Sequence, residues 1–183
     1  ALVPAISSEK AKSNKLEIIK KVESSLYLGL LIAIPCVFII NVYPEQILNL
    51  LFPNANKGIN ILKISSFTII FGVLSQTIAG AMQGLGRFYL PAKAYGIGIL
   101  FKIVINLTLI KIPFFGVNGA AIGTVICNAV AFIVLYYELK RELNIKLFQN
   151  MLLPIIGSIL MCVVSKKFIF QVFSIFDEKL VTI

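Results

Sequence analysis

The chain has 183 residues, of which 58% are hydrophobic and 14% charged, and its mean hydropathy is +0.95. A soluble domain is typically about half apolar and about a quarter charged, so this composition excludes intrinsic disorder and argues strongly against a water-soluble globular enzyme. There is no histidine, and the three cysteines (Cys36, Cys127 and Cys162) stand apart inside apolar runs. Neither a disulfide framework nor a metal or cofactor site is therefore expected, and an integral membrane protein remains.

The chain opens on a short apolar segment, residues 1–7, which a lysine-rich stretch follows to residue 23. We interpret these as the end of one transmembrane helix and a cytoplasmic connector, helical in its second half. The first residue is not Met and residues 180–183 look like the start of a further apolar run. We therefore expect a C-terminal part of a longer membrane protein, with an N-terminal bundle missing.

Five apolar stretches follow, and each approaches the roughly 20 residues that a helix needs to cross a bilayer. They lie at 24–44, 61–85, 92–111, 115–137 and 148–168. Their apolar residues do not alternate, and backbone groups in lipid must pair within their own segment, so helices are predicted rather than barrel strands. The fold class is all-α, a polytopic transmembrane helix bundle of about five spans. Residues 45–52 are too short to span, and their pattern suits a helix lying in the interface.

The net charge of +9 does not indicate a nucleic-acid partner in such a chain, because loops on the cytoplasmic side of membrane proteins are rich in Lys and Arg. Ten Lys and Arg residues lie before the first span or in loops on the same side of the membrane, against six on the other. This bias predicts a multi-pass protein of the plasma membrane with its N-terminal segment in the cytoplasm.

Polar residues within the second span share one side of the predicted helix. Gln76, Gln83 and Arg87 are spaced by seven and four residues, with several glycines nearby. One interpretation is the wall of a solvated substrate cavity. The other, which we favour for the glutamines, is close helix packing with amide hydrogen bonds between helices. Arg87 is more simply a cytoplasmic anchor.

Lys102 lies near the middle of the third span, with Asn106 one turn further on. An ammonium at bilayer depth costs about 2.5–3.5 kcal/mol or more, so we expect it to face an aqueous cavity and an anionic substrate. The alternative is snorkelling to an interface. No acidic residue lies within the five spans. Pro35 and Pro154 each remove a helix hydrogen bond and are hinge candidates, although such prolines are also common in membrane helices.

The sequence contains no pattern typical of an enzyme. The spans hold no pair of carboxylates, no histidine and no nucleophile with a base, and the chain has no phosphate-binding loop for ATP. We therefore predict a protein that is not an enzyme.

Several segments in order resemble one family of membrane proteins. They are IPCVFIINVYPEQILNLLFP, SQTIAGAMQGLGRFYLPAKA and NGAAIGTVICNAV. Together the chain resembles the C-terminal half of a stage V sporulation protein B-like flippase, in the polysaccharide-export and lipid-flippase family. That family belongs to the superfamily that also contains lipid II flippases and multidrug MATE exporters. The resemblance implies a MATE-like fold of two helix bundles with alternating access, and spans nine to thirteen of about fourteen.

The leading hypothesis is a flippase for an undecaprenyl-linked saccharide or peptidoglycan precursor. Lys102, Gln76, Gln83, Asn106 and Arg87 are the candidates for its cavity, and the partners are the bilayer and the lipid-linked oligosaccharide. One alternative is a cation-coupled multidrug exporter of the same fold, which needs carboxylates within the membrane. The other is a membrane scaffold for cell-wall or spore-cortex synthesis, in which Lys102 is packed against protein.

Overall fold

The computed structural model describes residues 2–52, 58–109, 112, 117–143 and 157. The predicted span at 148–168, with Pro154, lies outside these residues except for residue 157. The regular elements of the described part are all helices. It comprises α1 (Leu2–Ala11), α2 (Lys15–Val42), α3 (Pro44–Leu51), α4 (Ile59–Gly84), α5 (Tyr89–Leu109) and α6 (Asn118–Leu143).

Four of these helices, α2, α4, α5 and α6, are long and apolar enough to cross a membrane. They correspond to the first four predicted spans, so the predicted all-α polytopic bundle is confirmed. The helix α3 occupies the place of the predicted interfacial segment. Two helices extend by more than one turn beyond their apolar stretches: α2 begins at Lys15 and α6 ends at Leu143. Hydropathy marks where lipid can surround a helix, whereas backbone hydrogen bonds continue into the polar zone.

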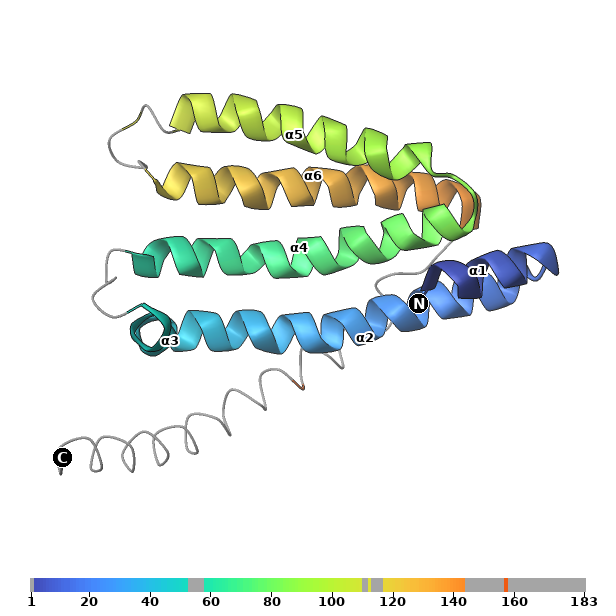
Figure 1. The fold of residues 1–183 in the computed structure, drawn as a ribbon, viewed down its shortest axis with the longest axis horizontal. Helices are drawn as coiled ribbons and strands as arrows, with labels where there is room; N and C mark the ends of the chain where they lie inside the picture. The colour runs from blue at the N-terminus through green and yellow to red at the C-terminus, as the bar shows by residue number, and fades with distance from the viewer. Residues whose placement is uncertain (1, 53–57, 110–111, 113–116, 144–156, 158–183) are drawn as a thin grey trace.

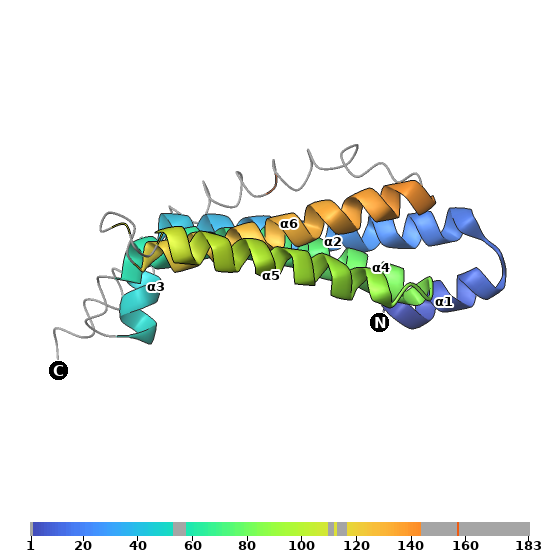
Figure 2. The ribbon, with the colours of Figure 1, turned by 90° about the horizontal axis from the view of Figure 1, so that it is seen from above.

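The long helices lie side by side in one layer, in the order α2, α4, α6, α5 (Figure 1). Seen along its edge, the layer carries α1 against one face at one end, where α1 packs on α2 and α4, and α3 turns away at the other end (Figure 2). Short connections place α4 beside α2 and α5 beside α6 as antiparallel neighbours. The connection from α4 to α5 is also short, yet α6 lies between these two helices.

The buried surface of the layer comes from stripes of apolar residues repeating every four positions. In α2 the stripe contains Ile18, Val22, Leu26, Leu30 and Ile34, and in α6 it contains Ala131, Leu135, Leu139 and Leu143. Large apolar side chains of α5 remain exposed, among them Leu100, Val104 and Leu107. In a membrane-spanning helix such side chains suit contact with acyl chains, whereas in water an exposed apolar patch promotes aggregation.

The turn from α4 to α5 explains the glycines of the QGLGR segment. The N–H groups of Gly86 and Arg87 donate to the carbonyls of Gln83 and Met82, at 2.9 and 2.8 Å. This is a Schellman motif, and its closing residue needs a positive φ. Gly86 supplies it with φ +78°. Gly84 has a separate role, because a Cβ there would lie 2.7 Å from the Cβ of Ile6 in α1.

Candidate functional site

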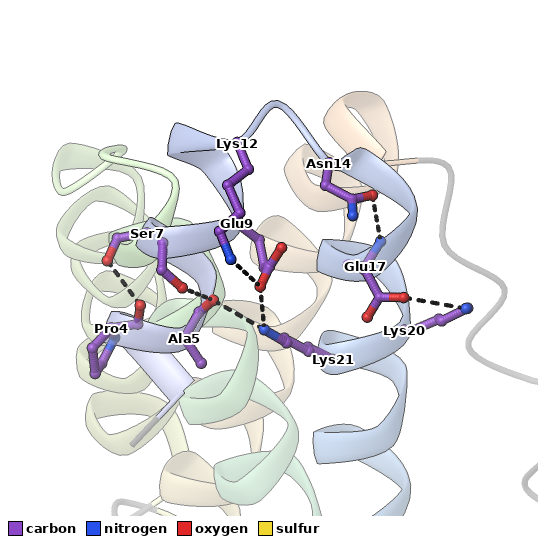
Figure 3. A network of polar contacts seen from close by, with 10 residues as sticks. Pro4, Ala5, Ser7, Glu9, Lys12, Asn14, Glu17, Lys20 and Lys21 are labelled. Atoms are coloured by element: carbon purple, nitrogen blue, oxygen red, sulfur yellow. Dashed lines mark hydrogen bonds and ion pairs between the residues drawn. The ribbon is translucent and has the colours of Figure 1, made fainter.

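Charged residues of the N-terminal connector tie α1 to α2 at one end of the layer. The ammonium of Lys21 lies 2.8 Å from Oε1 of Glu9, and Lys12 lies 3.8 Å from the same oxygen (Figure 3). The hydrogen bond from Lys21, followed by the charges of Lys12 and Lys21, lowers the pKa of the Glu9 carboxyl below its usual value, although burial acts against this. Asn14 begins α2 by accepting from the N–H of Glu17 at 3.3 Å.

Arg87 lies at the same end and is exposed. The prediction that it shares a helix side with Gln76 and Gln83 is wrong, because α4 ends at Gly84 and Arg87 belongs to the turn that follows. Its Nε is 2.9 Å from Oε1 of Glu142, near the end of α6, so an ion pair joins the α4–α5 turn to α6. Beside it, the ammonium of Lys10 donates to the carbonyl of Leu85, which satisfies one of the last carbonyls of α4. The Schellman turn thus places Arg87 toward α6, and α1 closes the other side.

A hollow of about 610 Å³ lies between these groups. Its polar lining comes from Lys10, Ser13, Lys15, Arg87 and Glu142, and its apolar lining from Ile18, Leu85 and Leu143. Of these lining residues, only Arg87 was a candidate site residue in the sequence analysis. Lys10 and Lys15 looked like ordinary connector lysines, and Glu142, 55 positions after Arg87, gave no pattern by which the pairing could be found.

Lys102 and Asn106 lie at the contact between α5 and α6. A Cβ at Gly123 of α6 would overlap the side-chain oxygen of Asn106 and would lie 3.7 Å from Cγ of Lys102. The stem of Lys102 therefore packs against α6 while the residue as a whole is half-buried. Within the described ranges its ammonium has no ion pair, and Oδ1 of Asn106 is buried without a hydrogen-bond donor.

Gln76 and Gln83 are both exposed on α4. A Cβ at Gly80, between them, would lie 3.9 Å from the side chains of Leu2 and Val3 in α1. Because positions three or four apart share a helix side, the two glutamines flank the contact with α1. The side-chain amides of both glutamines make no hydrogen bond to any residue that the structure describes. Gly72, one turn before Gln76, has open space around the position of a Cβ.

The candidates thus fall into three separate places. Lys102 and Asn106 lie at the α5–α6 contact, and the glutamines lie on the α1 side of α4. Arg87 lies at the end of the layer that also carries Lys10 and Lys15, which we call the basic end. No hydrogen bond or ion pair links these places within the described part of the chain. Pro35 lies inside α2, which continues through it to Val42.

Four apolar membrane-length helices in one layer, with one strongly basic end, define a multi-pass membrane protein. A family model described as lipid II flippase MurJ matches residues 1–183, and the chain belongs to that family. The predicted membership of the lipid-flippase superfamily is thereby confirmed.

Individual proteins resemble the chain across most of its length. It is 33% identical over 162 residues to the uncharacterized membrane protein YabM of Bacillus subtilis, covering 88% of this chain and 30% of YabM. It is 25% identical over 146 residues to the probable low-salt glycan biosynthesis flippase Agl15 of Haloferax volcanii, covering 79% of the chain and 30% of Agl15. The multidrug export protein MepA of Staphylococcus haemolyticus is 32% identical over 128 residues, covering 65% of the chain and 26% of MepA. The chain thus spans less than a third of each of these relatives. No solved structure matches it.

Proposed function

We propose that this chain is part of a flippase that moves an undecaprenyl-linked saccharide or peptidoglycan precursor across the plasma membrane by alternating access. The observation that carries the proposal is the family match along residues 1–183. The similarity to Agl15, named as a probable glycan biosynthesis flippase, supports a lipid-linked saccharide as the substrate class. In this proposal the N-terminal segment is cytoplasmic, and an N-terminal bundle of the same protein completes the cavity.

The α1 side of α4 is the part of the described chain best suited to a solvated cavity. It combines exposed Gln76 and Gln83 with the open position at Gly72. Amide groups hydrogen-bond to sugar hydroxyls without requiring a countercharge. Gln76 and Gln83 would then hold the saccharide, while the prenyl tail stays in lipid.

Lys102 is the candidate for the pyrophosphate. Its stem is fixed by the contact with Gly123, and its ammonium has no carboxylate partner among the residues described. An ammonium within the membrane that lacks a counterion favours an anionic ligand. Asn106, whose oxygen lacks a donor, lies one turn away and would orient the ammonium or accept a hydrogen bond from the ligand.

A multidrug exporter is the second candidate function, because the similarity to MepA favours it. Such a protein needs intramembrane carboxylates for cations and cationic drugs. The predicted spans contain none, which favours the anionic lipid-linked substrate.

Thiol labelling tests the proposed cavity. In the full-length protein without its native cysteines, Gln76→Cys and Lys102→Cys are treated with a membrane-impermeant thiol reagent, with and without the undecaprenyl-linked saccharide. Leu100→Cys, on an exposed apolar position of α5, is the lipid-facing control. The proposal expects labelling at 76 and 102 that the substrate reduces, and none at 100. If position 102 resists labelling in every state, Lys102 is packed as the scaffold hypothesis requires, and it is removed from the mechanism.

A further inference from the structure

The hollow at the basic end of the layer has more basic than acidic residues in its lining. Three cationic residues, Lys10, Lys15 and Arg87, and one acidic residue, Glu142, line it. Since Arg87 is paired with Glu142 at 2.9 Å, the two lysines provide the uncompensated charge.

The two ammonium groups also have hydrogen-bonding capacity to spare. An ammonium has three donors. Lys10 uses one on the carbonyl of Leu85. The ammonium of Lys15 has no hydrogen bond or ion pair to any residue in the described ranges, and the residue is exposed. An anion in the hollow therefore meets donors from two helices without breaking the Arg87–Glu142 pair.

The hollow lies at the ends of membrane-length helices, where membrane and water are expected to meet. It is formed at the beginning of α2 and at the ends of α4 and α6, which are three of the four helices long enough to span. Ile18, Leu85 and Leu143 add apolar lining next to the charged groups. Basic pockets between transmembrane helices are typical binding sites for lipid head groups, whose phosphate requires cations and whose glycerol region requires apolar surface.

We propose that this hollow binds the phosphate of an anionic phospholipid of the surrounding membrane. Lys10 and Lys15 donate to the phosphate oxygens, and the glycerol backbone rests against the apolar lining. The lipid then connects α1 and α2 to the α4–α5 turn. This site is separate from the saccharide cavity proposed at Gln76, Gln83 and Lys102, and its occupation does not depend on flipping.

The test measures equilibrium binding of a fluorescent phosphatidylglycerol to the full-length protein in uncharged detergent, with phosphatidylcholine as the neutral lipid. The variant is Lys10→Gln with Lys15→Gln. The control is Lys12→Gln with Lys20→Gln, which removes the same charge from side chains that are 71% and 73% exposed and do not line the hollow. We expect about thirtyfold weaker phosphatidylglycerol binding in the first variant, from two lysines lost, and less than a twofold change in the control.

An arginine variant and a competition experiment with inorganic phosphate complete the test. The variant Lys10→Arg with Lys15→Arg keeps both charges and should retain binding, which separates loss of the site from loss of the fold. Inorganic phosphate should compete poorly, because it has nothing to place on the apolar lining. Equal loss in the two glutamine variants would reduce the effect to general surface charge and overturn the proposal. Full competition by inorganic phosphate would overturn the assignment to a lipid.

Discussion

Gly98 of α5 offers a sharp test of the packing between α5 and α6. A Cβ at this position would lie 2.6 Å from the carbonyl oxygen of Cys127 and 3.2 Å from its Sγ. An ordinary contact begins near 3.4 Å, so the space is short by about 0.8 Å (3.4 − 2.6). The obstructing atom belongs to the backbone of α6 and cannot rotate away. Gly98→Ala therefore forces the two helices apart.

The cost of such overpacking is about 1–3 kcal/mol. Little else compensates for it, since α5 makes its main contact with α6 and leaves much of its surface exposed. Gly96 is the matched control on the same helix, because a Cβ there meets nothing within 4 Å. Replacing a helix glycine by alanine in open space stabilises a helix by up to about 1 kcal/mol.

The assay is thermal denaturation of the full-length protein in detergent, with the wild type, Gly98→Ala and Gly96→Ala compared side by side. We expect Gly98→Ala to melt below the wild type and Gly96→Ala to melt at or above it. If the two alanine variants melt together, α5 and α6 do not approach as closely as described, and the placement of Lys102 and Asn106 against Gly123 fails with them.

Two further predictions concern polar contacts. The pKa of Glu9 is lowered in the folded protein. Its carboxylate therefore stabilises the fold at pH values above the usual pKa of 4.5, and this stabilisation is lost as the pH falls below 4.5. The melting temperature of the wild type should exceed that of Glu9→Gln near neutral pH, and the difference should vanish toward acid; a difference independent of pH would contradict this. Ser66, which is buried, accepts from Nδ2 of Asn41 at 2.7 Å and donates to the carbonyl of Lys63 at 2.6 Å. Ser66→Ala should cost about 1 kcal/mol, whereas Ser65→Ala, which breaks no such contact, should leave the melting temperature unchanged; equal effects would show that the α2–α4 bond contributes nothing.

The fold followed from the sequence because lipid imposes a strong rule. An uncharged apolar stretch of about 20 residues must be helical to satisfy its backbone. This rule identified α2, α4, α5 and α6. The ends of α2 and α6 did not follow from hydropathy, because polar residues such as Lys15 and Glu142 continue a helix equally well in the head-group zone outside the hydrocarbon core.

The site was less accessible to sequence reasoning. Periodicity correctly placed Gln76 and Gln83 on one side of α4, but it could not tell which neighbour that side meets. Arg87 was predicted as a candidate, but its partner Glu142 was not. Glu142 belongs to another helix, and the ion pair depends on the Schellman turn at Gly86, which directs Arg87 toward α6. Contacts between distant segments depend on how the helices are ordered in the layer, which the spacing of residues within one helix does not encode. The assignments of Lys102, Gln76, Gln83, Asn106 and Arg87 to a substrate cavity, and of Pro35 and Pro154 to hinges, remain predictions.

Flipping itself is the most direct test of the central proposal. The full-length protein is reconstituted into liposomes that carry an undecaprenyl-linked saccharide, and movement between leaflets is followed by the accessibility of the sugar to an impermeant enzyme. If the chain is part of a flippase, we expect protein-dependent movement of this lipid, and no uptake of a cationic drug. Lys102→Ala or Gln83→Ala should slow the movement of the lipid. Drug transport without saccharide movement would contradict the account and establish the exporter in its place.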